Sequence, residues 1–170
     1  PMISHLGATI SVVNGSLMAK RMKGDNGRIG AACIGDGATS TGAFHEALNQ
    51  AAIENLPLLL VVANNQYAYS TPTSAQFACE RLSSKAKGYG VTSHDVDGTD
   101  LEACITTLDS AAQQAREGGG PQLIVAELLR LCGHGEHDDA QYVTQDVKDS
   151  KVGRDCMTRA KKILVQSYDY

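Results

Sequence analysis

The sequence predicts an α/β fold with an open, mostly parallel sheet and helices on both of its faces. Two observations lead to this prediction. Helix-like stretches alternate with short apolar stretches, which is the pattern of βαβ units with right-handed crossovers. The longest apolar run, 56–63, is typical of a strand buried inside a parallel sheet. The 170 residues, 42% hydrophobic and 20% charged, suffice for a sizeable core, and we expect residues 1–170 to form one domain.

The first part of the chain predicts a helix followed by one βαβ unit. Small and aliphatic residues predict a buried helix over 7–22, with Lys20 and Arg21 placed favourably near its carboxyl end. After a turn at 24–27, the predicted elements are a strand at 28–34, a glycine-rich loop at 35–42, a helix at 43–55 and a strand at 58–63.

The second part continues the alternation. Asp100 is a suitable cap for a helix that Gly118 to Pro121 would end. The predicted elements are a loop at 66–75, a short helix at 78–87, strands at 91–96 and 122–129 with the helix 100–117 between them, a mobile polar loop at 133–143 and a cationic helix at 154–166. Because parallel strands bind ligands beyond their carboxyl ends, we expect the polar residues that follow these strands to share a site.

Composition excludes several classes of function. The net charge of −4 leaves no basic surface for nucleic acid and no polybasic patch for a membrane. The apolar run at 56–63 is too short to cross a bilayer. The five cysteines are scattered and form no CxxC pair, so we expect free thiols, a reducing compartment and a cytoplasmic protein.

The pairing of Gly35-Asp36-Gly37 with Asn64-Asn65 is the most informative feature of the chain. Each motif follows a predicted strand, so a carboxylate and an amide would meet at one sheet edge. Such oxygens suit Mg²⁺, which usually also binds substrate phosphates. The glycines would adopt positive φ and let the backbone approach a diphosphate, and the helix start at 40–42 would offer free amides to it. The alternative is a plain strand-to-helix turn with an aspartate cap.

With these motifs in place, the chain resembles the alpha chain of the thiamine diphosphate-dependent 2-oxo acid dehydrogenases, the decarboxylating component of the pyruvate and branched-chain complexes. The resemblance runs from about Ser4 to Tyr142 and implies the thiamine diphosphate-binding fold. It rests on five blocks in one order: Gly35-Asp36-Gly37-Ala38, Asn64-Asn65-Gln66-Tyr67, Ser70-Thr71-Pro72-Thr73-Ser74, Val96-Asp97-Gly98, and Arg130 through Gly133-His134 to Asp138-Asp139. The third block and the paired aspartates are most similar to the branched-chain type.

The resemblance implies a set of site residues. Asp36, the Asn65 side chain and the main-chain carbonyl of Tyr67 would bind Mg²⁺, while Asn64 would hydrogen-bond neighbouring loops. His134 would be catalytic and would also contact the cofactor, because imidazole transfers protons near neutral pH. The remaining positions are Gly35, Gly37 and Ala38 against the diphosphate, and Ser4 and Leu6 near the pyrimidine ring.

Other polar residues are expected to be structural. Arg130 would pair with an aspartate to order the loop at 133–143, which we favour over a second metal site at His137, Asp138 and Asp139. We expect His94 to be a hydrogen-bonded strand-end residue. Glu46 is a tempting base, but in the family the glutamate that activates the cofactor comes from the beta chain.

The resemblance also implies an activity and partners. The reaction would be oxidative decarboxylation of pyruvate or a branched-chain 2-oxo acid, with acyl transfer to the lipoyl disulfide of a partner acyltransferase. The chain would be a core fragment without the N-terminal part of the alpha chain, inactive alone, and would join a beta chain in an α₂β₂ tetramer in the bacterial cytoplasm, or in the mitochondrial matrix of a eukaryote. The alternatives are an acetoin dehydrogenase alpha chain and a non-catalytic assembly subunit.

Overall fold

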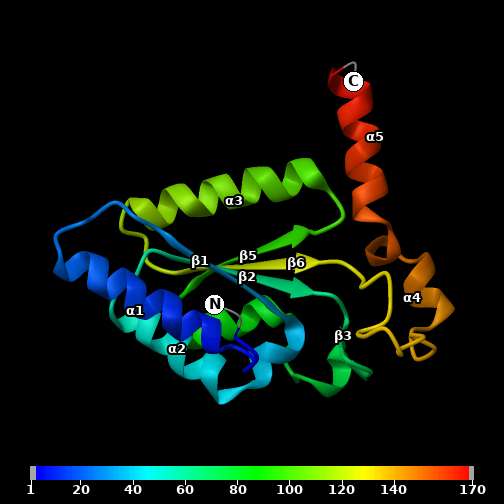
Figure 1. Ribbon diagram of the computed structural model, residues 1–170, viewed down its shortest axis with the longest axis horizontal. Coiled ribbons are helices and arrows are strands. Elements are labelled where there is room, and N and C mark those ends of the chain that lie inside the picture. The colour runs from blue at the N-terminus through cyan, green and yellow to red at the C-terminus, as the bar shows by residue number, and fades with distance from the viewer. Residues whose placement is uncertain (1–2, 169–170) are drawn as a thin grey trace.

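The computed structural model describes residues 3–168 and contains an open, four-stranded parallel sheet (Figure 1). The strand order is β1-β2-β6-β5, and all three neighbouring pairs are parallel. The strands are β1 (Gly30–Gly35), β2 (Leu58–Asn64), β5 (Thr92–Asp97) and β6 (Gln122–Glu127). The predicted parallel sheet is therefore confirmed, and its carboxyl edge collects the residues that follow Gly35, Asn64 and Glu127.

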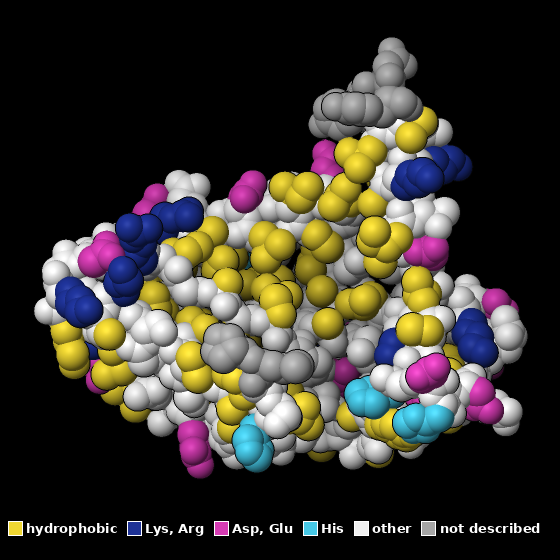
Figure 2. Space-filling model, in the orientation of Figure 1, with side chains coloured by type: hydrophobic (Ala, Val, Ile, Leu, Met, Phe, Trp, Pro, Cys, Tyr) yellow, Lys and Arg dark blue, Asp and Glu magenta, His cyan; other side chains and the backbone are white. Residues whose placement is uncertain are grey.

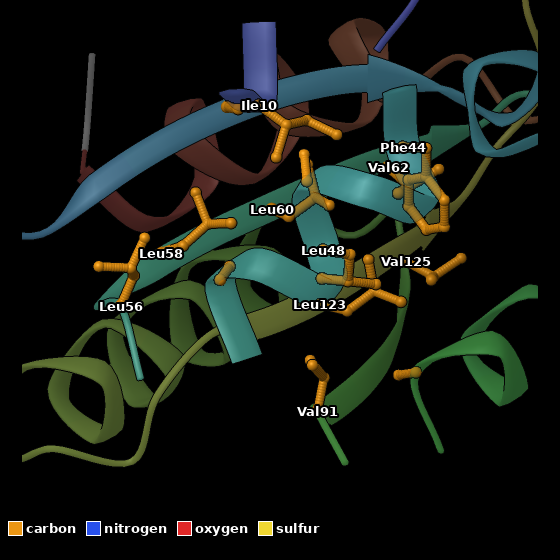
Figure 3. Close-up of a cluster of buried hydrophobic side chains, with 14 of the residues drawn as sticks. Ile10, Phe44, Leu48, Leu56, Leu58, Leu60, Val62, Val91, Leu123 and Val125 are labelled. Atoms are coloured by element: carbon orange, nitrogen blue, oxygen red, sulfur yellow. The ribbon is translucent and has the colours of Figure 1, made fainter. Parts of the chain in front are cut away.

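Helices cover both faces of the sheet, as predicted. Figure 1 shows α3 (Leu101–Arg116) along one face, and α1 (Ala8–Met22) and α2 (Gly42–Ile53) across the other. The larger core lies between the sheet and α1, α2 and η3 (Leu82–Tyr89), and Figure 3 shows several of its side chains. Alternate residues of β2 divide between the two cores: Leu58, Leu60 and Val62 belong to this one, whereas Leu59 packs with α3 in the second.

Side-chain caps fix the start of two helices. The Asp100 carboxylate accepts a hydrogen bond from the Ala103 amide at 3.0 Å at the start of α3, as its sequence predicts. Thr41 caps α2 in the same way, through the Phe44 amide at 3.3 Å. The end of α3 is followed by Gly118 and Gly120 at positive φ, which explains why glycines stand there.

Short elements depart from the predictions. The glycine-rich segment is a 3₁₀ helix, η1 (Asp36–Ser40), rather than a loop, and the helix predicted at 78–87 is the 3₁₀ helix η3, displaced toward the carboxyl end. The remaining unpredicted elements are the hairpin of β3 (Tyr67–Ala68) and β4 (Thr71–Pro72), η2 (Thr73–Ala75), α4 (Gln145–Asp149) and η4 (Lys151–Gly153). Such elements are too short to show a hydrophobic period.

The last helix, α5 (Cys156–Tyr168), extends away from the sheet (Figure 1). Arg159 connects its first turns to the body by donating to the Thr99 carbonyl at 2.7 Å. Apolar side chains gather over the face between α1, α3 and α5 in Figure 2. The exposed large apolar residues of these three helices include Val12, Ile105 and Met157. No helix within residues 3–168 has the length and apolar character needed to span a bilayer.

Candidate functional site

A cavity of about 310 Å³ opens at the carboxyl edge of the sheet. It brings together residues from the ends of β1 and β2, the β3–β4 hairpin and the loop after β6. Its lining residues are Leu6, Gly35, Asp36, Gly37, Ala38, Asn65, Tyr67, Ala68, Tyr69, Arg130 and His134. Eight of the nine predicted site residues are in this set, whereas Ser4 is exposed and does not line the cavity.

A second hollow of about 360 Å³ lies along α1 and the start of β1 and shares no lining residue with this cavity. Its walls are mainly aliphatic, and its cations Lys20 and Arg28 are both paired with Asp25. The cavity at the carboxyl edge is the better candidate site, because convergent polar groups distinguish a binding site from a surface hollow.

Asp36 is a buried carboxylate, with 1% of its surface exposed. Its Oδ2 accepts a hydrogen bond from Gln76 Nε2 at 2.6 Å. Within residues 3–168, no lysine, arginine or histidine forms an ion pair with it. A buried carboxylate without a cation is costly, so the position suits a bound metal ion.

The glycines around Asp36 act differently from the prediction. Neither Gly35 nor Gly37 adopts positive φ, so that expectation is wrong. A Cβ atom at Gly37 would lie 2.6 Å from the Ala68 Cβ, which means that glycine is needed for close packing of η1 on the hairpin. A Cβ at Gly35 would meet nothing within 4 Å, so this position leaves room beside Asp36. The cavity is lined by residues 35–38 rather than by the start of α2 at 40–42.

The turn formed by residues 64–67 places the second predicted ligand. The Asn65 Oδ1 accepts a hydrogen bond from the Tyr67 amide at 3.2 Å, which closes a tight side-chain turn. Asn64 instead donates through Nδ2 to both carboxylate oxygens of Glu127, at 2.8 and 3.0 Å. Asn64 is thus structural, as expected, although its partner lies on the neighbouring strand and not on a loop.

Tyr67 is 8% exposed, and its ring centroid lies 5.4 Å from that of Tyr142. The ring therefore joins a small core beneath the loop at 130–143, together with Leu129 and Val143. Only the backbone of Tyr67 remains a candidate metal ligand.

The loop at 130–143, called the His134 loop below, is held by Arg130 and Asp138. The Arg130 Nη2 lies 3.7 Å from the Asp138 Oδ2, so the predicted pairing with an aspartate is confirmed. The same guanidinium donates to the Tyr69 carbonyl at 3.0 Å and to the Tyr142 hydroxyl. His134 is exposed at the rim, with its ring centroid 5.0 Å from that of Tyr69.

Asp138 is the electrostatic centre of this loop. Its Oδ2 accepts hydrogen bonds from the Tyr142 hydroxyl and the His134 amide, both at 2.6 Å, and its Oδ1 accepts from the Ala140 amide at 3.0 Å. The hydrogen bond from Tyr142, then that from His134, lowers the pKa of the Asp138 carboxyl to about 2. Burial, followed by the neighbouring carboxylate, raises the pKa of Tyr142. The predicted mobile loop is therefore fastened to its own aspartate.

The other predicted structural residues have local partners. His45 Nδ1 lies 2.6 Å from the Tyr89 hydroxyl, and His94 Nε2 lies 2.9 Å from Gln122 Oε1. Glu46 is exposed and does not line the cavity. His137 Nε2 lies 3.2 Å from the Tyr69 hydroxyl. Across residues 3–168, no group of three or more His, Cys, Asp or Glu could hold a metal ion, and all five cysteines are free.

Three residues that support the site from outside the cavity lining were missed from the sequence. Gln76 contacts Asp36, and Glu127 contacts Asn64, across long stretches of chain. Lys85 donates to the Thr39 carbonyl of η1 at 2.9 Å and lies over the Phe77 ring, 5.1 Å from its centroid. Burial lowers the pKa of Lys85. A glutamine, glutamate or lysine in a polar segment is normally solvated, so the sequence offered no reason to expect these three side chains to make buried contacts.

Comparisons with known proteins identify the relatives of this chain. The family described as "Dehydrogenase E1 component" matches residues 2–168. The alpha subunit of 3-methyl-2-oxobutanoate dehydrogenase from Mycobacterium tuberculosis is 40% identical, over 96% of this chain and 45% of its own length. The alpha subunit of acetoin:2,6-dichlorophenolindophenol oxidoreductase from Cupriavidus necator is 35% identical, over 95% of this chain and 49% of its own. The pyruvate dehydrogenase E1 alpha subunit of Acholeplasma laidlawii is 34% identical, over 94% of this chain and 47% of its own length.

A solved structure assigned as a thiamin diphosphate-dependent enzyme of Mycobacterium smegmatis superimposes with a TM-score of 0.59 at 26% identity. The match covers 74% of this chain and 22% of that one. The chain spans about half the length of the curated relatives it matches. Since the family match extends over nearly all of its residues, the chain belongs to the dehydrogenase E1 component family, among relatives named as alpha subunits.

Proposed function

We propose that this chain is the cofactor-binding core of a 2-oxo acid dehydrogenase alpha subunit that binds thiamine diphosphate and Mg²⁺. The observation that carries the proposal is Asp36, a buried carboxylate without a basic partner among the described residues, which lines one cavity with Asn65 and His134. The coarse function follows from the family, and this carboxylate supplies the reason why a metal ion is needed at this edge of the sheet.

The donor set fits the proposed ion. Asp36, the Asn65 side-chain oxygen and the Tyr67 carbonyl would hold Mg²⁺ with hard oxygen ligands, and Gly35 to Ala38 would lie along the diphosphate. Ser4 and Leu6 would lie near the pyrimidine ring, although the structure places only Leu6 at the cavity. When bound, thiamine diphosphate supplies the electron sink for decarboxylation.

The proposed task of His134 is proton transfer at the cavity rim. Its ring lies beside Tyr69, and its backbone amide is fixed by Asp138. A side chain placed there can give or take a proton at the substrate carbonyl oxygen and can also contact the cofactor. The Arg130–Asp138 pair keeps that loop over the cavity.

The proposed reaction is oxidative decarboxylation of pyruvate or a branched-chain 2-oxo acid, with the lipoyl disulfide of an acyltransferase as acceptor. The chain would act only with a beta chain, in an α₂β₂ tetramer, in the bacterial cytoplasm or, in a eukaryote, the mitochondrial matrix. Acetoin is the alternative substrate, supported by the 35% identical acetoin oxidoreductase subunit. Product analysis of the assembled enzyme with pyruvate, branched-chain 2-oxo acids and acetoin distinguishes these three candidate substrates. A non-catalytic assembly subunit would not need a buried carboxylate that lacks a basic partner among residues 3–168.

Thermal unfolding with Mg²⁺ alone and with Mg²⁺ plus thiamine diphosphate tests the cofactor site. A ligand that binds only the folded chain at 100 times its Kd adds about 2.7 kcal/mol of stability, which raises Tm by roughly 5–10 °C. We expect this shift in the wild type and in Asn26→Ala, a control in an exposed turn, and its loss in Asn65→Ala. The measurement is made on the chain alone and assembled with a beta chain. No shift in either form would overturn the proposed function.

A further inference from the structure

Gln66 occupies a strained backbone position between the two candidate metal ligands. Its φ is 76°, in the left-handed region that residues other than glycine seldom adopt. Asn65 precedes it and Tyr67 follows it, so its conformation decides how the Asn65 side chain and the Tyr67 carbonyl are directed. A conformation of this kind persists only where its surroundings hold it.

The Gln66 side chain supplies that hold. Its Nε2 donates to Glu127 Oε2 at 2.9 Å, to the Asn64 carbonyl at 3.0 Å and to the Leu128 carbonyl at 3.4 Å. All three acceptors lie at the adjoining ends of β2 and β6, where Asn64 and Glu127 are partners in register. The side chain therefore ties the turn to the rigid sheet rather than to another loop.

Glu127 is dedicated to this arrangement. Its carboxylate accepts from Asn64 Nδ2 and Gln66 Nε2, and no ion pair with a basic residue engages it within residues 3–168. Two amides from one four-residue turn thus meet on a single half-buried carboxylate. Hydrogen bonds to an ionised acceptor are stronger than those between neutral groups, which suits an anchor.

We propose that Gln66 and Glu127 form a brace that positions Asn65 and Tyr67 for the metal ion. They are positioning residues, since neither lines the cavity. The inference rests on the proposed function, because the brace can position metal ligands only if Mg²⁺ binds at Asn65 and Tyr67. Residues that orient metal ligands typically change metal affinity or activity by 10–100-fold when they are mutated.

The test measures the apparent Kd for Mg²⁺ at saturating thiamine diphosphate, with the thermal shift as the readout. It uses the chain alone or the chain assembled with a beta chain, whichever form shows a shift in the wild type. We expect Gln66→Ala and Glu127→Ala each to weaken Mg²⁺ binding by roughly 10–100-fold. The double variant should lose little more than one single variant, because both remove the same brace. Gln113→Ala is the matched control: Gln113 donates to Glu117 at 2.9 Å in an exposed pair on α3, and its loss should leave the Kd unchanged.

Gln66→Gly separates the brace from the strain. Glycine adopts positive φ freely, so this variant should fold well and still bind Mg²⁺ weakly because the turn is no longer fixed. An unchanged Kd in Gln66→Ala and Gln66→Gly, with a responsive wild type, would overturn the brace and leave the proposed function standing. A wild type that responds in neither form overturns both. If Glu127→Ala does not fold, the two Gln66 variants decide.

Discussion

The turn at 64–67 and the His134 loop lie on the same cavity, but different contacts hold them there. The turn is tied to the carboxyl ends of β2 and β6 through the amides of Asn64 and Gln66 on Glu127. The His134 loop is tied mostly to itself, through Arg130 and Asp138. A candidate metal site thus rests on the sheet, while the candidate catalytic histidine rests on a charged pair within its own loop.

This difference matters for what each region can do. A metal ligand must keep its direction within narrow limits, which rigid elements provide better than loops. A residue that transfers protons at a rim can belong to a segment that moves as substrates enter and products leave. The two means of attachment match these two tasks.

The largest effect is expected from breaking the contact between η1 and the hairpin. Gly37→Ala would place a Cβ 2.6 Å from the Ala68 Cβ, so we expect a loss of about 1–3 kcal/mol in stability and a weaker response to thiamine diphosphate. Urea unfolding measures the loss. Gly35→Ala is the control within the same motif, because its Cβ meets nothing within 4 Å and its backbone is extended. Equal stabilities for the two variants would contradict the close-packing explanation.

A smaller, local effect is expected from Asp138→Asn. The amides of residues 133–143 should exchange roughly 10-fold faster with solvent, while the global unfolding midpoint stays nearly unchanged, because the carboxylate fastens only this loop. The pKa of Asp138 is about 2 in the folded chain, below the ordinary 3.8. Its contribution is therefore complete above about pH 4 and is lost as the pH falls toward 2.

Hydrogen exchange measured from pH 5 down to pH 2, after correction for intrinsic rates, checks that the contribution of Asp138 is lost as the pH falls. The wild-type His134 loop should loosen across that interval. Asp138→Asn should show no such step. A step of the same size in the variant would exclude Asp138 as its cause.

The smallest effect is expected from Lys85→Met. Lys85 donates to Thr39 beneath η1, but burial lowers its pKa, so its charge is partly unfavourable in the folded chain. Methionine keeps the packing on Phe77 and removes that cost, and the free energy of unfolding should change by less than about 1 kcal/mol. Denaturant unfolding at pH 7 gives the value. A change of several kcal/mol would mean that η1 depends on this lysine far more than on Gly37.

Much of the fold was available from local patterns. Apolar residues that share a helix face or a buried strand are close in sequence, so α1, α2, α3 and the four parallel strands were predicted with nearly correct bounds. The elements that escaped are short, such as the hairpin at 67–72 and η1. They are too short to show a hydrophobic period, and the packing of η1 on the hairpin joins segments that lie far apart in the chain.

The candidate site divides along the same line. By itself, the sequence determined that Asp36, Asn65 and His134 follow strands of a parallel sheet and thus share its carboxyl edge. Only the tertiary structure decided that Gln76 reaches Asp36 and that Gln66 reaches Glu127, 40 and 61 residues away in the chain. The reason is the strand order β1-β2-β6-β5, which places Asn64 beside Glu127. That order depends on how the helices pack on the sheet, which no local stretch of sequence specifies.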